Sequence, residues 1–342
     1  MLEFAHGGDI KSFAKQLNCK VDEIIDLSSN INFIKPDIDI DFNTLDISAY
    51  PNYDDLYKAL AKNYNINIEN IELFNGGSSA IFSLFGFLKS KGLQKCTIYS
   101  PAYLEYKKAS TIFDFHIKQI NRLENIGQMV LPNSLVIFVN PSTPDGTLYD
   151  IEEYLQYWKQ NNCIVLIDES FLDFTNGVSA IKYLNEFDNI FILKSLTKFY
   201  SSAGIRLGMI ISNSANIQSF KSIQSAWKIS QFDSNYIQEV LKDTKFKNIA
   251  KSININNNLL LKKVLEDSNL FEKVYESKAN YILAKLKNID AKTLQQHLQK
   301  YKIMIRDCSN FDFLNSSYVR VAVKSENSIK LLKEALSSVD KQ

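Results

Sequence analysis

The residues best suited to chemistry in this chain stand just after runs of apolar residues. Asp168 and Glu169 follow the run 164–167, and Lys198 comes a few residues after the run 190–193. Open α/β sheets bind ligands at the carboxyl ends of their strands, so these side chains could face a ligand. A buried aspartate needs a cationic or hydrogen-bonding partner to offset its desolvation. A protonated pyridine nitrogen is one such partner, and it would let the ring withdraw electrons from the α-carbon of a substrate.

Each of these residues also has a simpler interpretation. A single lysine such as Lys198 is more often solvated than reactive, because its charge is costly to bury. Asp168 could instead cap a helix or bind a metal ion, but no histidine lies near it in the sequence to complete a set of metal ligands. We therefore assign no metal site.

Two adjacent glycines join a short strand to a segment with helical spacing. Gly76 and Gly77 are followed by Ser78 and Ser79. Residues without a Cβ let the backbone approach an anion, and the N-terminus of a helix over 79–89 would present free N–H groups and a partial positive charge. The two serine hydroxyls would add donors. A simple helix cap would explain the same residues equally well.

Two more polar residues follow expected strands. Tyr103 comes after the run 97–99 and could offer a flat ring for stacking, and Asn140 comes after the run 135–139 and could offer an amide donor. Taken alone, Tyr103 is more typical of a core residue and Asn140 of a turn. Together these residues are more informative than any one of them, because all of them stand at the end of a strand or at the start of a helix.

Alternating strands and helices must position these side chains. The expected strands are apolar throughout, which is typical of strands buried on both faces, and they span 97–99, 135–139, 164–167, 190–193 and 209–211. The expected helices between them span 79–89, 103–112 and 151–160, the last with Asp150 as its N-cap. This alternation predicts a mostly parallel sheet that is covered on both sides.

The pattern changes after Ser212. Residues 215–266 look helical throughout, with the asparagine-rich segment 254–258 as the weakest part. A smaller α+β domain is then predicted by short strands that alternate with helices, the strands at 273–276, 281–284, 302–306 and 318–323 and the helices at 293–300 and 325–338. The N-terminal residues have weak periodicity, and we expect them to form an arm that packs across both domains.

The overall composition excludes several classes of protein. The 342 residues include 39 Lys+Arg and 38 Asp+Glu, and a formal net charge of +1 gives no general preference for nucleic acid or acidic membranes. No apolar run approaches the roughly 20 residues of a membrane helix, and the first residues lack the pattern of a signal peptide. The four cysteines are widely spaced without a CxxC pair. We therefore expect a cytoplasmic protein without nucleic-acid or membrane partners.

In this order, the segments around Gly77, Tyr103, Asn140, Asp168 and Lys198 resemble those of the fold type I pyridoxal-phosphate enzymes. The resemblance runs through nearly the whole chain, from His6 to about Val323. It implies an α/β fold with a mostly parallel, seven-stranded sheet in a large domain and a smaller α+β domain at the C-terminal end. The expected divisions are an N-terminal arm over 1–45, a large cofactor-binding domain over 46–235 and a small domain over 236–342.

The resemblance also implies roles around the cofactor, pyridoxal 5'-phosphate. Lys198 would form the Schiff base, and Asp168 would pair with the pyridine nitrogen. Tyr103 would stack on the ring, and Asn140 would donate a hydrogen bond to its phenolic oxygen. Phe171 departs from the pattern, because many relatives have a tyrosine there that bonds the same oxygen.

The cofactor's phosphate would be held near the glycine pair. The resemblance implies that its contacts come from Gly77, Ser78, Ser79, Ser195 and Arg206. Tyr50, within Ala49-Tyr50-Pro51, would reach the phosphate bound by the neighbouring subunit. That role requires a homodimer with its active sites at the subunit interface.

Within this superfamily the chain is most similar to two sister groups, the threonine-phosphate decarboxylases of cobalamin biosynthesis and the histidinol-phosphate aminotransferases. The decarboxylase group is favoured by the segments 5–10, with its His-Gly-Gly start, 195–200, and 305–311 leading to 318–323. The resemblance implies that Arg320 grips the α-carboxylate of the substrate, as the geometry of a guanidinium allows. It further implies that His6, Asn32 and Arg306 help to hold the substrate and its phosphate.

Departures from the decarboxylase pattern flank the substrate rather than the cofactor. Relatives usually have arginine at Lys194, proline at Phe33 and a glycine-containing loop in place of 311–314. We expect decarboxylation of phosphoserine or phosphothreonine, which differ by one methyl group worth about 1–3 kcal/mol of discrimination, to an amino-alcohol phosphate. An aminotransferase of the histidinol-phosphate type is the main alternative. A protein that binds the cofactor without turnover is the second.

Overall fold

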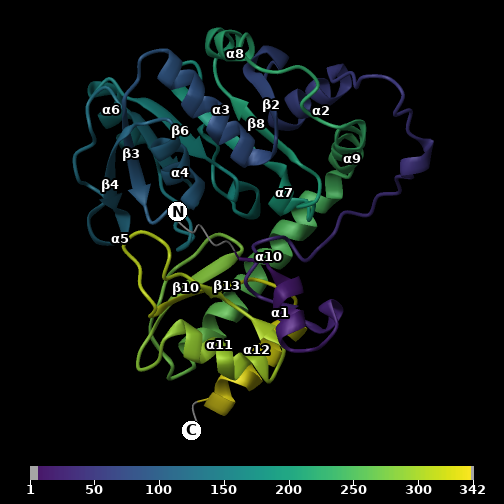
Figure 1. Cartoon of the computed structure of the whole chain (residues 1–342), viewed down its shortest axis with the longest axis vertical. Helices are drawn as coiled ribbons and strands as arrows, with labels where there is room; N and C mark the ends of the chain where they lie inside the picture. Colours follow the sequence, from purple (N-terminus) through teal and green to yellow (C-terminus); the bar gives the residue numbers. More distant parts are fainter. Residues whose placement is uncertain (1–6, 340–342) are drawn as a thin grey trace.

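A seven-stranded sheet forms the larger half of the molecule, the upper part of Figure 1. The computed structural model describes residues 7–339. In the order β2-β8-β7-β6-β5-β3-β4, the sheet consists of β2 (Ile71–Asn75), β8 (Leu207–Ile211), β7 (Ile190–Ser195), β6 (Ile164–Asp168), β5 (Leu135–Val139), β3 (Lys95–Ser100) and β4 (His116–Asn121). Among these seven strands β8 alone runs in the opposite direction, antiparallel to both β2 and β7, so the mostly parallel seven-stranded sheet is confirmed.

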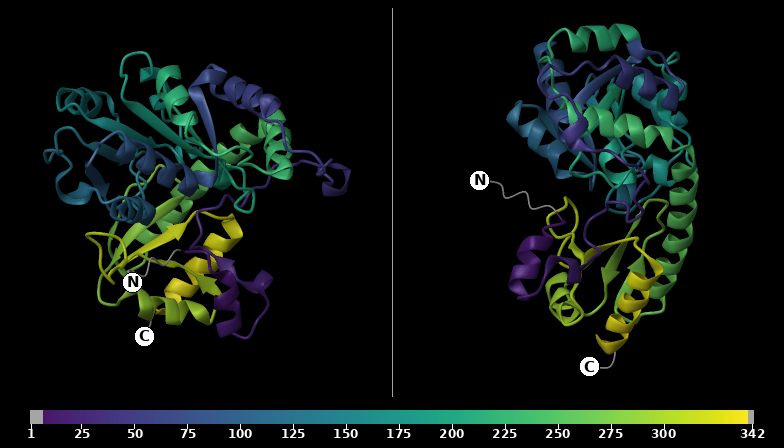
Figure 2. Two further views of the ribbon diagram at one scale, coloured as in Figure 1. Left: turned by 45° about the horizontal axis from the view of Figure 1, so that its top comes forward. Right: turned by 90° about the vertical axis from the view of Figure 1, so that its right-hand side faces the viewer.

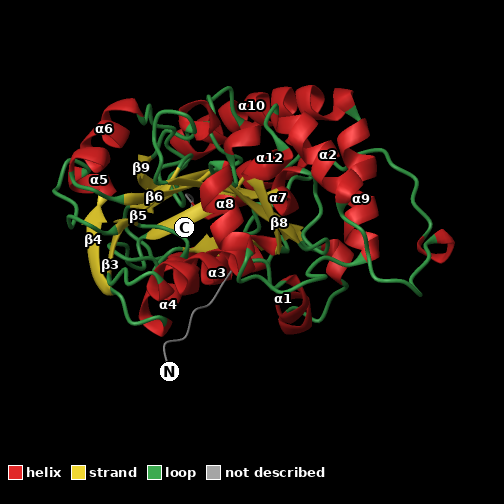
Figure 3. Cartoon of the chain, turned by 90° about the horizontal axis from the view of Figure 1, so that it is seen from above, coloured by secondary structure: helices red, strands yellow, loops and turns green. Residues whose placement is uncertain are grey.

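Helices cover both faces of this sheet (Figure 3). One face carries α3 (Gly76–Ser90), α4 (Leu104–Ile112) and α8 (Ser214–Lys221), and the other carries α2 (Asp54–Tyr64), α6 (Glu152–Gln160), α9 (Gln231–Lys242) and the first part of α10 (Thr244–Glu266). The strands explain this arrangement, because successive side chains point to opposite faces. In β5, Val136 and Phe138 belong to the cluster beneath α6, while Leu135 and Ile137 belong to the cluster beneath α3. Both faces are therefore core, as the continuous apolar runs indicate.

The smaller half contains a four-stranded antiparallel sheet. In the order β12-β13-β10-β9, its strands are β12 (Arg306–Asp307), β13 (Tyr318–Ala322), β10 (Tyr281–Leu286) and β9 (Phe271–Val274). The apolar core of this half is completed by α11 (Ala291–Gln299), α12 (Glu326–Val339) and the second part of α10. In the right-hand view of Figure 2, α10 runs down one side of the molecule and joins the two halves.

The N-terminal arm contacts both halves. After α1 (Ile10–Gln16), β1 (Ile25–Asp26) pairs in parallel with β11 (Ile303–Met304), and Leu27 is buried in the core of the smaller half. A few residues later, the backbone N–H of Asn32 donates to the carbonyl of Lys198 in the larger half, at 3.0 Å. The arm therefore crosses the junction between the two halves.

The helical segment expected over 215–266 is three helices rather than one. α8 ends at Lys221, and α9 begins at Gln231 after a loop, with the hydroxyl of Ser230 accepting a hydrogen bond from the first turn of the helix. The carboxylate of Asp243 then accepts two backbone N–H bonds at the start of α10. Serine and aspartate offer the chain these alternative bonds, which is why they favour helix starts over helix interiors.

The asparagine-rich segment 254–258 is an ordinary part of α10 rather than a weak point. The amide of Asn257 donates to the carbonyl of Lys324 at 2.8 Å, and the amide of Asn258 donates to the carbonyl of Ala279 at 2.8 Å. These tertiary hydrogen bonds offset the low helix propensity of asparagine.

Three smaller expectations also differ from the structure. β4 was not predicted, because it is an edge strand that pairs with β3 alone and carries several polar residues. The strand expected at 302–306 is split between β11 and β12, which belong to different sheets. Ile151 rather than Asp150 is the N-cap of α6, although a carboxylate oxygen of Asp150 accepts the backbone N–H of Glu152 at 3.3 Å.

The apolar cores of the two halves meet different parts of α10. Phe246 and Ala250, near its start, belong to the core of the larger half, and Leu261 and Leu265, near its end, belong to the core of the smaller half. We therefore propose that the large domain extends into α10 and that the boundary lies beyond residue 235.

Candidate active site

A cavity of about 470 Å³ lies at the carboxyl ends of the parallel strands, where the two halves and the arm meet. Its wall takes residues from all three parts, with Gly8 from the arm, Asp168 from β6 and Arg320 from β13. Of the residues singled out in the sequence, the wall includes Gly77, Ser78, Tyr103, Asp168, Ser195, Lys198, Arg206, Arg306 and Arg320. The structure therefore brings together most of the expected site.

Lys198 is presented by a short helix, α7 (Leu196–Phe199), that begins directly after β7. Its Nζ donates to the hydroxyl of Ser195 at 3.1 Å. Burial lowers the pKa of Lys198 by more than the nearby carboxylate of Asp168 raises it, and the charge of Arg206 adds to the lowering. A lowered pKa keeps more of the amine neutral, and the neutral amine is the nucleophile.

The buried carboxylate of Asp168 is fixed by two donors. The hydroxyl of Tyr106 on α4 donates to Oδ2 at 2.6 Å, and the backbone N–H of Ser170 donates to Oδ1 at 2.8 Å. Burial raises the pKa of Tyr106 well above its usual value, and the charge of Asp168 raises it further, so Tyr106 remains a donor. An ionised carboxylate has about four acceptor positions. Asp168 therefore keeps capacity to bind a cationic ring nitrogen.

The glycine pair and Arg206 form a cradle at the start of α3. Gly76 has a φ of +79°, and a Cβ at this position would overlap the guanidinium of Arg206. A Cβ on Gly208 would lie 2.7 Å from the backbone of Gly76 and Gly77, so β8 also needs a glycine here. A helix N-terminus and a guanidinium that converge in this way suit an anion such as a phosphate group.

Ser78 and Tyr103 meet beside this cradle, with their hydroxyl oxygens 3.1 Å apart. Tyr103 precedes α4 as its N-cap, and burial raises its pKa by more than the hydrogen bond with Ser78 lowers it. Its ring lies edge-on to that of Tyr106, with centroids 6.2 Å apart. Ser79, by contrast, is not part of the cavity wall. Stacking of Tyr103 on a bound ring stays a prediction.

Arg306 and Arg320 line the side of the cavity that belongs to the smaller half. They face each other across the β12–β13 pair and are 9% and 8% exposed. Arg320 donates to the hydroxyl of Thr143 at 3.3 Å and to the carbonyl of Ser28 at 3.2 Å, but its Nε has no hydrogen-bond partner within residues 7–339. Burial lowers the pKa of both arginines. Two neighbouring buried cations favour the binding of an anion.

Two asparagines expected at the ligand make hydrogen bonds within the protein, and their contacts with a ligand stay predictions. The amide of Asn140 donates to the carbonyl of Tyr149 at 3.0 Å and accepts its backbone N–H at 2.9 Å, so Asn140 closes a turn. The amide of Asn32 donates to the carbonyl of Phe199 at 2.8 Å and braces α7. Neither residue lines the cavity.

Tyr50 also lies outside the cavity wall of its own chain. It is 75% exposed and stacks on Trp227, with ring centroids 4.1 Å apart. Its contact with a neighbouring subunit stays a prediction. His6 lies outside the residues that the structure describes.

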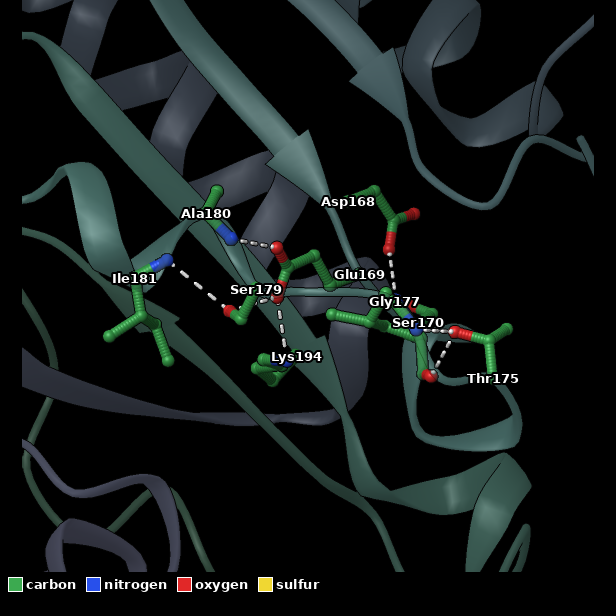
Figure 4. A network of polar contacts seen from close by, with 10 residues as sticks. Asp168, Glu169, Ser170, Thr175, Gly177, Ser179, Ala180, Ile181 and Lys194 are labelled. Carbon is green, nitrogen blue, oxygen red and sulfur yellow. Dashed lines mark hydrogen bonds and ion pairs between the residues drawn. The ribbon is translucent and has the colours of Figure 1, made fainter. Parts of the chain in front are cut away.

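Glu169, the residue after Asp168, faces the opposite side of the sheet (Figure 4). It forms an ion pair with Lys194 at 2.6 Å, and both side chains are at most 3% exposed. Glu169 also accepts the hydroxyl of Ser179 and a backbone N–H, both at 2.6 Å. Because Asp168 and Ser195 are the chain neighbours of this pair, it ties β6 to β7 directly behind the cavity.

The sequence analysis missed Tyr106 and the partnership of Glu169 with Lys194. Tyr106 lies three residues after Tyr103, so helical spacing was a usable signal that the two share one side of α4. The pairing of Glu169 with Lys194 depends on the register of β6 and β7. The local sequence alone does not predict that register.

These features fit pyridoxal 5'-phosphate. The cradle that a Cβ on Gly76 would fill can take its phosphate, with Arg206 as the counter-charge. Lys198 offers an amine of lowered pKa to its carbonyl carbon, and Asp168 offers a fixed carboxylate to its ring nitrogen.

Comparisons with known proteins agree with this fit. A sequence model of the family described as aminotransferase class I and II matches residues 24–339. The chain is 28% identical to the threonine-phosphate decarboxylase of Salmonella typhimurium, over 98% of this chain and 96% of that protein. It is also 28% identical to an adenosylcobalamin biosynthesis bifunctional protein of Leptospira interrogans, over 98% of this chain, but it spans only 41% of that longer protein.

A solved structure shows the same similarity. The histidinol-phosphate aminotransferase from Clostridium acetobutylicum has a TM-score of 0.82 and 26% identity, covering 93% of this chain and 99% of that one. The fold expected from the resemblance is therefore confirmed. The relatives include both a decarboxylase and an aminotransferase, so similarity does not select the reaction. The family match extends over most of the chain, and we conclude that the chain belongs to the aminotransferase class I and II family and that its cofactor is pyridoxal 5'-phosphate.

Proposed function

We propose that this enzyme decarboxylates an O-phospho-L-amino acid, phosphoserine or phosphothreonine, to an amino-alcohol phosphate. The observation that carries the proposal is the pair of buried arginines, Arg306 and Arg320, on neighbouring strands in the cavity wall. Such a substrate has two anionic groups besides its amine, a carboxylate and a phosphate, and thus provides one partner for each arginine. A guanidinium can bind either group through paired hydrogen bonds.

The residues of the cavity would divide the work of this reaction. Bound pyridoxal phosphate supplies an electron sink for the bond that breaks at the α-carbon. Asp168 would keep a positive charge on the ring nitrogen. Arg320, already fixed by Thr143 and Ser28, would orient the carboxylate, and its Nε offers a donor without a described partner. The carboxylate would leave as CO₂, and Lys198 in its protonated form would deliver a proton from Nζ to the α-carbon in its place.

The arm supports decarboxylation rather than amino transfer. Gly7 and Gly8 belong to the His-Gly-Gly start that resembles the decarboxylases, and both line the cavity. A Cβ on Gly7 would lie 3.0 Å from the carbonyl oxygen of Ser28 and 3.2 Å from Cδ of Arg306. The arm therefore fits closely against the arginine that would bind the substrate's phosphate. Contact of His6 with the substrate remains part of this proposal.

We also propose that the enzyme is a homodimer. Tyr50 and Trp227 are exposed as a stacked pair, and Phe42 and Ile47 add exposed apolar surface in the same part of the chain as Tyr50. Apolar surface of this kind favours burial against a second copy. Tyr50 would then be available to the cofactor's phosphate in the neighbouring subunit.

The expected location is the reducing cytoplasm. The four cysteines are free thiols, three of them buried, which suits a protein that does not depend on disulfides. Within residues 7–339, no helix has both the length and the apolarity needed to cross a membrane.

A substrate series tests the proposed function. CO₂ release from phosphothreonine, phosphoserine, threonine and serine is measured with the cofactor-loaded enzyme. We expect the unphosphorylated amino acids to have kcat/KM lower by about 100-fold or more, because they leave Arg306 without its anion. Arg306→Gln should remove most of this preference. The proposal fails if no substrate releases CO₂, or if phosphorylation makes no difference.

A further inference from the structure

The loop between β12 and β13 holds Arg306 from two sides. The carboxamide oxygen of Asn310 accepts Nη2 of Arg306 at 2.7 Å. Phe311 lines the cavity, and the centre of its ring lies 5.5 Å from the guanidinium carbon of Arg306. The position of this loop therefore sets the position of the arginine.

The same loop is attached to the larger half by an ion pair. Nζ of Lys107 on α4 donates a hydrogen bond to the carboxylate of Asp312 at 2.5 Å, and both side chains are partly buried. Lys107 lies four residues after Tyr103, so the two residues project from the same side of the helix. The Lys107–Asp312 pair thus links the loop around Arg306 to the helix that carries Tyr103 into the cavity wall.

An apolar contact reinforces this attachment. Leu123, on the short helix α5 (Arg122–Asn125), packs with Leu314 against the cluster that contains Cys308 and Phe311. In Figure 1 the loop reaches up from the smaller half toward α5.

Phe313 shows that the loop is held in an unfavourable conformation. Its φ is +67°, in the left-handed region that favours glycine, and its side chain is half exposed. A bulky residue keeps this conformation only where its surroundings impose it. Asp312, the residue before Phe313, forms the ion pair with the larger half, and Leu314, the residue after it, packs against the same apolar cluster as Leu123.

We propose that the Lys107–Asp312 pair positions Arg306 for the substrate's phosphate by fixing residues 308–314 against α4. This inference rests on the proposed function, in which Arg306 binds that phosphate. Neither Lys107 nor Asp312 lines the cavity, so both are positioning residues that act through Asn310 and Phe311. Asp312 belongs to the segment 311–314, which stands where the family resemblance leads one to expect a glycine-containing loop.

A charge cycle in the cofactor-loaded enzyme tests the inference. The variants are Asp312→Asn, Lys107→Met, their combination, and the exchange of both charges by Lys107→Asp with Asp312→Lys. Binding is measured with phosphoethanolamine, which has no carboxylate to lose. Hydrogen exchange is followed at the amides of Phe311 and Leu314, which bond within the loop at 3.0 and 3.1 Å.

Each single variant should weaken phosphoethanolamine binding by about three- to tenfold and speed exchange in the loop. The double variant should be no worse than the single ones, because either change already breaks the pair. The charge exchange should restore most of the loss. For phosphoserine, KM should rise while kcat changes little, and the affinity for pyridoxal phosphate should stay as in the wild type.

Glu272→Gln is the matched control, because Glu272 pairs with Lys285 at 2.8 Å on the sheet of the smaller half, outside the cavity wall. It should leave both measurements unchanged. The inference is overturned if the single variants bind and exchange like the wild type, or if the charge exchange rescues nothing. If the wild type itself binds no phosphoethanolamine, the proposed function fails, and loop exchange alone then decides whether the pair holds the loop.

Discussion

The guanidinium of Arg206 lies so close to Gly76 that no side chain could be placed between them. The positive φ of Gly76 alone would favour glycine, but the contact with Arg206 makes it a steric requirement. The end of β2, the start of α3 and the loop before β8 therefore pack so closely that only a glycine fits between them. Gly77 and Arg206 both line the cavity here, and we propose that this is where the cofactor's phosphate binds.

Gly76→Ala should weaken the binding of pyridoxal phosphate at least tenfold. A displaced Arg206 loses a charged hydrogen bond worth about 1.5–3 kcal/mol, and the left-handed backbone adds about 1–2 kcal/mol of strain. Titration of the apo-enzyme with the cofactor gives the affinity. Gly92→Ala is the control, because Gly92 also has a positive φ, +88°, but no described atom lies within 4 Å of a Cβ there. Equal affinities in the two variants would contradict the role of the cradle.

Tyr106→Phe should lower kcat by about tenfold and leave KM nearly unchanged. The hydroxyl of Tyr106 donates to the carboxylate of Asp168, and a hydrogen bond to a charged group is worth about 1.5–3 kcal/mol. Tyr99→Phe provides the comparison, since the hydroxyl of Tyr99 is also buried but accepts from Trp158 away from the cavity wall. Steady-state kinetics of both variants would reject the role of Tyr106 if their kcat values were the same.

The positions of some site residues can be predicted from the local sequence, and those of others cannot. Asp168, Lys198 and the glycine pair stand next to apolar runs, so their place at strand ends follows from the chain alone. Arg306 and Arg320 face each other because β12 pairs with β13, and the register of that pair depends on the tertiary structure. The spatial partnership of the arginines therefore became visible only in the structure.

The same distinction explains the errors in the fold. The loop before α9 interrupts a sequence whose helical spacing continues on both sides, and the break is marked only by the capping residue Ser230. The helical state of Asn257 and Asn258 depends on carbonyl acceptors far away in the sequence. Propensity alone predicts the opposite at these positions.

Lys194→Met should destabilise the protein by about 3–5 kcal/mol, because it leaves the carboxylate of Glu169 buried without its partner. Lys194→Arg, the residue usual in relatives, should cost much less since it keeps the ion pair. Urea unfolding measures both losses. A loss below about 1 kcal/mol for Lys194→Met would show that the pair contributes little, as exposed pairs do.

The stability that Lys194 provides should also have a defined pH dependence. Burial is the largest single effect and lowers the pKa of Lys194, but the charge of Glu169, its hydrogen bond to Lys194 and the charges of Asp173 and Asp168 together outweigh burial and raise the pKa above its usual value. A lysine whose pKa is raised on folding stabilises the fold fully below its unfolded value and loses this effect as the pH rises through the folded value. The difference between the wild type and Lys194→Met should therefore be constant from about pH 7 to 10 and shrink only above about pH 10.4. A difference that shrinks between pH 7 and 9 would contradict this assignment.

Capture of the cofactor should report the lowered pKa of Lys198. Only the neutral amine attacks a carbonyl, so the rate at which apo-enzyme forms the absorbance band at about 420 nm should rise with pH and level off below the ordinary lysine pKa of about 10.4. Lys198→Ala should form no such band. A midpoint at or above the ordinary value would show that burial does not activate the amine.

The most direct test of the central claim asks which bond at the α-carbon breaks. The cofactor-loaded enzyme is incubated with phosphothreonine or phosphoserine labelled in the carboxylate carbon, in the presence of 2-oxoglutarate, and labelled CO₂ and glutamate are measured in the same sample. Decarboxylation predicts labelled CO₂ in a one-to-one ratio with the amino-alcohol phosphate and no glutamate above the level of Lys198→Ala. Glutamate formation without labelled CO₂ would contradict the account and identify an aminotransferase.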